Sequence, residues 1–134
     1  MRIGINENYL DNAHAGGIYV AVSNEGIMQK YAMKYDQGKY EVHPNSKIRF
    51  EGYKLPFINR IIDAAIELHK CVPQIGFINW DFSVDSNENI VLIEANMMCG
   101  GIWAFQNAWG CGVFGEDTEY MIEQIKISPF GKKL

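Results

Sequence analysis

Residues 76–96 read GFINWDFSVDSNENIVLIEAN, and this stretch predicts two antiparallel strands joined by a short turn. Apolar and polar residues alternate over residues 78–84, residues 90–95 are apolar apart from Glu94, and the DSNEN segment between them is typical of a turn. If the turn is centred between Asn87 and Glu88, the apolar residues of both strands share one face, as a buried sheet face requires. A shift of one residue would mix apolar with polar residues, so the pattern itself favours this register.

The same register brings four polar side chains together on the opposite face. Asp81 lies opposite Glu94, and Asn79 lies opposite Asn96. Two carboxylates in directly opposed positions have Cβ atoms about 5 Å apart and repel each other, and the hairpin contains no Lys or Arg. A divalent cation removes this repulsion and accepts oxygen ligands from both carboxylates and from the Asn amide. The patch therefore predicts a Mg²⁺ site that leaves coordination positions for nucleotide phosphates.

A solvated sheet face and a glycoside hydrolase site are two other interpretations of this patch. On a solvated face, Asp81 and Glu94 would pair with basic side chains from elsewhere in the chain, as surface acidic residues often do. Their position deep within apolar strands, where water has least access, favours a functional site instead. Retaining glycoside hydrolases also place two carboxylates about 5–5.5 Å apart, but that interpretation gives no role to Asn96 or to the loop over residues 12–17.

Short extended segments in the first third of the chain predict an antiparallel meander, because the turns between them are too short for parallel crossovers. Strands are expected over residues 2–6, 18–22 and 27–35, with a further short segment ending at His43. This part of the chain would therefore supply most of a sheet.

Two helices are expected in the remainder. Pro56 begins the first, in which apolar residues recur at helical spacing until about Cys71. Residues 116–127 form the second, whereas residues 98–115, rich in Gly and Trp, are expected to be an irregular loop over a site. The sequence thus predicts an α+β fold class, an antiparallel β-sheet with helices packed on one side, in a single domain over residues 1–134.

Composition and charge exclude several classes of function. A hydrophobic fraction of 48% with 21% charged residues is ordinary for a globular domain. The formal net charge of −4 argues against a nucleic-acid or membrane-surface partner, since both need a basic field. The sequence has neither a transmembrane segment nor the apolar core of a signal peptide, so a cytoplasmic protein is expected.

The hairpin motif resembles a known signature. Asp81, Glu94 and Asn96 form the pattern D-x₁₂-E-x-N, with Leu-Ile before the Glu, which is similar to the metal-binding signature of the ATP-grasp superfamily. There the Asp, Glu and Asn coordinate two Mg²⁺ (or Mn²⁺) ions that bridge the phosphates of ATP, so the resemblance implies these roles here. It also implies nucleotide contacts for Leu92, which shares the face and would lie near the adenine, and for Asn79, where many relatives have an arginine.

The N-terminal segment adds to the resemblance. ATP-grasp enzymes often carry an Arg on a strand and then an N-x₃-GG loop near the phosphates, and Arg2 with Asn12, Gly16 and Gly17 matches this pattern. The resemblance implies that Arg2 and Asn12 act in catalysis on phosphate or acyl-phosphate oxygens, and that Arg2 and the two glycines contact the nucleotide. The segment DNAHAGGI, His43-Pro44, Trp80-Asp81 and the loop around Gln106 are similar, more narrowly, to the sugar-transfer-associated ATP-grasp family.

This resemblance covers about residues 1–126 and implies a reaction class. The function would be that of the Mg-ATP-binding portion of an ATP-dependent carboxylate–amine ligase in polysaccharide or cell-envelope biosynthesis, acting on a small-molecule or sugar-linked acceptor. Relatives have a preceding subdomain with phosphate-binding lysines, which is expected to be absent here, so the chain would be the C-terminal ATP-grasp subdomain. Two hypotheses follow: half of an enzyme whose N-terminal half is a separate chain, or a non-catalytic remnant that forms a homodimer or binds a partner.

Overall fold

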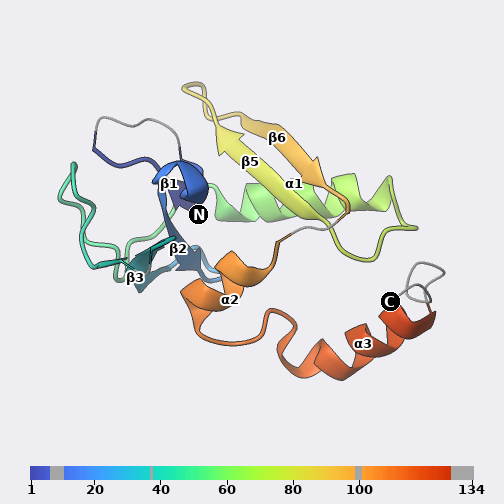
Figure 1. Cartoon of the computed structure of the whole chain (residues 1–134). Coiled ribbons are helices and arrows are strands. Elements are labelled where there is room, and N and C mark those ends of the chain that lie inside the picture. Colours follow the sequence, from blue (N-terminus) through green and yellow to red (C-terminus); the bar gives the residue numbers. More distant parts are fainter. Residues whose placement is uncertain (7–10, 37, 99–100, 128–134) are drawn as a thin grey trace.

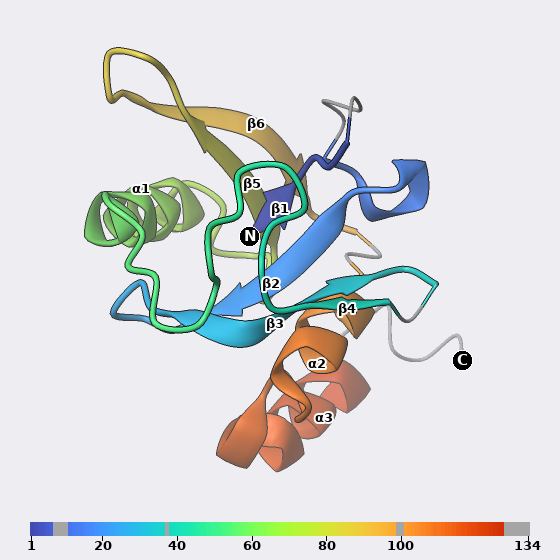
Figure 2. The same cartoon turned by 90° about the vertical axis from the view of Figure 1, so that its left-hand side faces the viewer.

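The computed structural model describes residues 1–6, 11–36, 38–98 and 101–127. It has an α+β fold built from antiparallel strands, which confirms the predicted class. In the described residues the strands form two sheets. One has four strands in the order β1-β2-β3-β4, and the other is the hairpin of β5 and β6. Figures 1 and 2 show α1 and the hairpin on one side of the four-stranded sheet and α2 and α3 on the other.

The four-stranded sheet is the predicted meander. Its strands are β1 (Arg2–Ile3), β2 (Ile18–Val22), β3 (Met28–Lys34) and β4 (Lys39–Tyr40). One face packs against residues from the neighbouring loops and forms the main core, which comprises Ile5, Ile18, Val20, Met28, Ala32 and Phe50. The alternation along β2 sends Tyr19 to the other face, where it packs with Ala13 and Met33 under two alanines of α2.

The first helix, α1 (Ile58–Lys70), confirms the helix predicted after Pro56. It lies beside the hairpin, where Ile61, Ile62 and Ala65 on its apolar face line a hollow together with Trp80 and Phe82. A two-stranded hairpin has little stability in water without such a neighbour. The last helix, α3 (Thr118–Ile127), follows a single 3₁₀ turn, η2 (Gly115–Asp117), within the region predicted to be helical.

The prediction of an irregular loop over residues 98–115 is wrong for the central part of this segment. Residues 103–109 form α2 (Trp103–Trp109), which contacts β2 and β3. Ala104 and Ala108 lie four residues apart on one face of this helix, and their small side chains let it pack closely on Tyr19 and Met33. Gly110 ends the helix with φ of 74°. Glycines on both sides of this short segment favour a loop, so the sequence pattern did not predict the helix.

The hairpin strands are β5 (Asn79–Val84) and β6 (Ile90–Asn96). The predicted register is confirmed where it pairs Asp81 with Glu94 and Asn79 with Asn96. Beyond Asp81 a β-bulge shifts the pairing, so that Phe82 lies opposite Leu92. Directly opposed residues share a face, so the expectation that Leu92 shares the face of Asp81 is wrong. The contact of Leu92 with the adenine, which the family resemblance implies, stays a prediction.

The turn explains this shift. Asp85 accepts hydrogen bonds at Oδ1 from the backbone N–H groups of Asn87 and Asn89, both at 2.8 Å, and Glu88 adopts a left-handed φ of 64°. This closes a tighter turn centred on Asn87, with Val84 opposite Ile90. The bulge takes up the resulting one-residue difference between the two strands.

Packing is uneven along the chain. Apart from Ile78, every buried residue of the described part lies within residues 5–50. Large apolar side chains are exposed on the hairpin and on all three α-helices, among them Ile66, Ile93 and Ile125. Within the described residues, no helix has both the length and the apolarity needed to cross a bilayer.

Candidate functional site

The candidate site lies on the polar face of the hairpin. Asp81 of β5 pairs with Glu94 of β6, and the next pair on this face is Asn79 with Asn96. Asp81 is half-buried, but Glu94 is exposed, so water has access to one member of the carboxylate pair. The opposite face of β5 carries Trp80 and Phe82, whose rings stack 6.4 Å apart. The alternation of the strand therefore separates the polar site from the apolar contact with α1.

A basic side chain reaches this site from another sheet. The Nη2 atom of Arg2 in β1 lies 3.1 Å from Oδ2 of Asp81, and its Nε lies 3.4 Å from Oδ2 of Asp11. The hairpin itself lacks a basic residue, so Arg2 is the partner from elsewhere that a solvated-face interpretation requires. Three carboxylates and one guanidinium still leave the cluster negative, and no ion pair involves Glu94 within the described residues.

The loop between Asp11 and Gly17 borders Arg2. Its centre is a short 3₁₀ helix, η1 (Ala13–Ala15), which Asn12 caps by accepting a hydrogen bond at Oδ1 from the His14 N–H at 3.1 Å. The Asn12 carbonyl accepts from the N–H groups of Ala15 and Gly17. A Cβ at Gly17 would overlap the Asp11 carbonyl oxygen, and Gly16 has φ of 96°. Both glycines are therefore required by the loop backbone itself.

Asn79 has a role that the sequence did not reveal. Its Nδ2 donates a hydrogen bond to the Gly101 carbonyl at 3.1 Å, which ties the polar face of the hairpin to the segment leading into α2. At the start of α2, Trp103 makes edge contacts with the rings of Tyr19 and Tyr35, and His14 contacts both Tyr35 and Trp103. The helix predicted as a loop thus connects the hairpin with the loop that holds Asn12.

The donor atoms at the site fit a hard cation. Asp81, Glu94 and Asn96 offer carboxylate and amide oxygens, which are the ligands that Mg²⁺ and Mn²⁺ accept, and Mg²⁺ needs few carboxylates when phosphates complete its shell. No cluster of three or more His, Cys, Asp or Glu with metal-binding geometry exists among the residues described. Two carboxylates and an amide would leave coordination positions of a hard cation unfilled, so other oxygen ligands would have to complete its shell.

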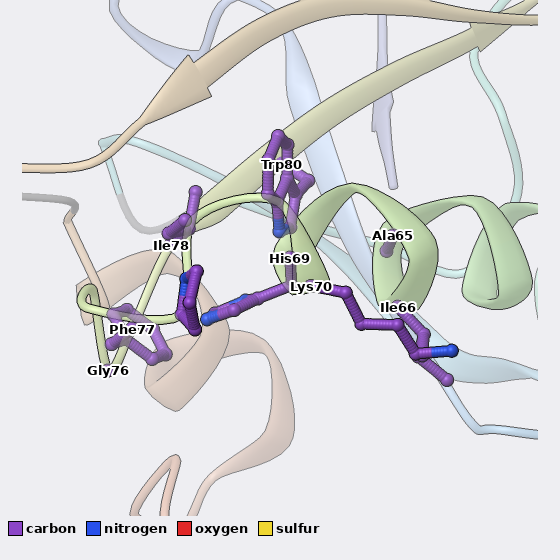
Figure 3. A pocket seen from close by; sticks show the side chains of 9 residues that line it. Ala65, Ile66, His69, Lys70, Gly76, Phe77, Ile78 and Trp80 are labelled. Carbon is purple, nitrogen blue, oxygen red and sulfur yellow. The ribbon is translucent and has the colours of Figure 1, made fainter.

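A hollow in the described part of the chain lies away from this site. It has a volume of about 520 Å³ and opens between α1 and the segment leading into β5. Figure 3 shows Ile66, His69 and Lys70 of α1 on one side of it and Phe77, Ile78 and Trp80 on the other. Its wall is mainly apolar, and Trp80 faces away from Asp81 along the strand. The hollow is therefore distinct from the carboxylate pair.

Comparison with known families shows to which family the chain belongs. The sequence profile of the sugar-transfer-associated ATP-grasp family matches residues 1–122 of the 134-residue chain. The chain belongs to this family. The match includes every residue of the candidate site, from Arg2 to Asn96, and membership of an ATP-grasp family supports ATP as the nucleotide. Neither the curated proteins nor the solved structures contain a match to the chain.

Proposed function

We propose that the polar face of the hairpin binds Mg²⁺–ATP. The observation that carries this proposal is the directly opposed pair of Asp81 and Glu94, with Asn96 as the next residue on that face. Asp81, Glu94 and Asn96 would ligate the metal, or Mn²⁺ in its place. Family membership supports the nucleotide, and the uncompensated negative charge of the cluster supports the cation.

The neighbouring residues would act on the phosphates. Arg2 supplies a guanidinium that can donate two hydrogen bonds to phosphate oxygens. Asn12 would act as a donor through Nδ2, since its Oδ1 already caps η1. Gly16 and Gly17 keep the loop backbone close to Arg2. Asn79 would steady the segment before α2 through its bond to Gly101, beside the bound nucleotide.

The reaction we propose is the ATP-dependent joining of a carboxylate to an amine or a similar nucleophile. The acceptor would be a small molecule or a sugar-linked compound in polysaccharide or cell-envelope biosynthesis, as the sugar-transfer association of the family suggests. When bound, Mg²⁺ would supply Lewis-acid stabilisation of the phosphate charge. Arg2 and Asn12 would hold phosphate or acyl-phosphate oxygens, and the supply of ATP would place the activity in the cytoplasm.

Calorimetric titration with ATP tests the proposal. ATP should bind in the presence of Mg²⁺ and fail to bind with EDTA, and Asp81→Asn should abolish the metal-dependent binding. Asp63→Asn is the matched control, because it removes one negative charge from an exposed position on α1. Binding that is the same with EDTA, or that survives in a folded Asp81→Asn chain, would contradict a metal site at the hairpin.

A second candidate function is a partner-binding module that retains the ATP-grasp fold. The observation that favours it is the exposure of apolar side chains on α1, β6 and α2, including Ile66 at 50%, Ile93 at 63% and Phe105 at 48%. A homodimer or a separate chain with the N-terminal ATP-grasp half would cover such residues. A folded chain that binds no ATP but sediments as a dimer, and as a monomer after Ile93→Lys, would support this candidate.

A further inference from the structure

Arg2 lies between two carboxylates that come from different segments. Asp11 approaches its Nε from the loop before η1, and Asp81 approaches its Nη2 from β5. The side chains of Arg2 and Asp11 are about half exposed, at 42% and 50%, while that of Asp81 is more covered, at 26%. The guanidinium thus has two partners, of which only Asp81 belongs to the proposed metal site.

A metal ion and Arg2 would compete for the carboxylate of Asp81. The guanidinium contacts Oδ2 of Asp81, and a cation that coordinates this carboxylate would lie within a few ångströms of Arg2. Two positive charges at that distance repel each other, so binding of the metal must weaken the contact between Arg2 and Asp81. Asp11 then remains as the counter-ion of Arg2.

The backbone keeps Asp11 in place for this role. Its carbonyl oxygen packs against Gly17, where no Cβ fits, and the Gly17 N–H donates to the Asn12 carbonyl at 3.0 Å. Arg2 is fixed independently, because it pairs with Tyr19 in the β1–β2 ladder. The closed loop and the ladder therefore hold the backbones of Asp11 and Arg2 in fixed positions, from which the two side chains can stay in contact when Asp81 binds a metal ion.

We propose that Asp11 is a positioning residue that retains Arg2 when a metal ion takes Asp81, so that the guanidinium stays directed at the phosphates. The inference depends on the proposed metal site at Asp81. Arg2 lowers the affinity for the metal ion alone and raises the affinity for the metal–nucleotide complex. Asp11 weakens the first of these effects, because it pairs with the same guanidinium. The dependence of the Asp11 effect on the presence of Arg2 distinguishes this role from a general effect of charge.

Titration with Mn²⁺ in the absence of nucleotide tests the exchange of Asp81 between Arg2 and the metal ion. Binding is measured as the decrease of the EPR signal of free Mn²⁺. Arg2→Ala should raise the affinity for Mn²⁺ by about two- to fivefold, the scale of a partly exposed ion pair, and Asp11→Asn should lower it by a similar factor. In the Arg2→Ala background, Asp11→Asn should have a smaller effect, because only its long-range charge remains. With Mg²⁺ and ATP, Arg2→Ala should instead weaken binding of the nucleotide.

Controls separate this proposal from the metal site on which it depends. Asp36→Asn removes a carboxylate that pairs with Lys34 at 3.0 Å on the β3–β4 turn, and it should leave Mn²⁺ binding unchanged. If the wild-type chain binds Mn²⁺ through Asp81 but Arg2→Ala does not raise the affinity, the exchange is wrong while the metal site stands. If Asp11→Asn has the same effect in both backgrounds, Asp11 acts through its charge alone. If the wild-type chain binds Mg²⁺–ATP but does not bind Mn²⁺ alone, the exchange is overturned while the metal–nucleotide site stands.

Discussion

The guanidinium of Arg2 contacts the carboxylate of Asp81, with 3.1 Å between Nη2 and Oδ2. The sequence pattern assigns the first residue to phosphates and the second to a metal ion, whereas the fold places one directly against the other. Part of the repulsion between Asp81 and Glu94 is therefore relieved without any metal. This distinguishes the two members of the carboxylate pair, because only Asp81 has a basic partner among the described residues.

The two carboxylates should respond differently to neutralisation. Glu94→Gln removes the cross-strand repulsion without loss of an ion pair and should stabilise the metal-free chain by about 0.2–1 kcal/mol. Asp81→Asn removes the same repulsion but also the contact with Arg2, so its free energy of unfolding should change by less than about 1 kcal/mol in either direction. Urea unfolding of both variants measures the difference. Equal stabilisation by the two substitutions would mean that the contact with Arg2 contributes nothing.

Gly17 should not tolerate a side chain. In Gly17→Ala the added Cβ overlaps the Asp11 carbonyl, so the loop must move, at a cost of about 1–3 kcal/mol. Gly76→Ala is the control, because a Cβ there has no atom within 4 Å and should change stability by less than about 0.5 kcal/mol. Thermal unfolding compares the two variants. A Gly17→Ala chain as stable as the wild type would show that the loop adopts another closure.

The hydrogen bond between Tyr19 and Asn107 should contribute to holding α2 on the sheet. Asn107 Nδ2 donates to the Tyr19 hydroxyl at 2.7 Å, and the ring of Tyr19 is buried. Tyr19→Phe keeps the ring contacts and should cost about 0.5–1.5 kcal/mol. A double-mutant cycle with Asn107→Ala isolates the pairwise contribution, and Tyr120→Phe, at an exposed position of α3, is the control. A coupling energy near zero would mean that the apolar contacts alone hold the helix.

The sequence was sufficient for features that depend on local patterns. Alternation in the hairpin predicted the pairing of Asp81 with Glu94, and Pro56 marked the beginning of α1. Both signals are contained in a few neighbouring residues. The family signature lies in the same hairpin and in the N-terminal loop, so membership was predicted as well and is confirmed.

Features that depend on tertiary contacts were not predicted. The shift that removes Leu92 from the Asp81 face arises because the side chain of Asp85 selects a tighter turn, and strand alternation carries no information about that choice. α2 forms because two alanines fit against Tyr19 and Met33, a contact between segments far apart in the sequence. The approach of Arg2 to Asp81 likewise joins two separate sheets.

The turn of the hairpin should make stability depend on pH through Asp85. Hydrogen bonds from the Asn89 side chain and from the backbone N–H groups of Asn89 and Asn87 stabilise the ionised carboxylate and lower the pKa of Asp85 below its ordinary value of 3.8. A group with a lowered pKa in the folded state stabilises the protein above the unfolded value. That contribution is lost as the pH falls through the lowered pKa. Stability should therefore decrease in this acidic range partly because Asp85 becomes protonated.

Comparison of the wild type with Asp85→Asn isolates this contribution, since the amide keeps an accepting oxygen but carries no charge. The wild type should be the more stable chain at pH 6, and the difference in free energy of unfolding should shrink as the pH falls below 3.8. Asp63→Asn is the control, because the side chain of Asp63 is exposed and makes no hydrogen bond or ion pair within the described residues, and its difference from the wild type should be small at pH 6. Urea unfolding across this pH range measures both. A difference for Asp85→Asn that is independent of pH would mean that the turn is held by its geometry and not by the carboxylate charge, in which case the bulge beside Asp81 would persist in the protonated chain.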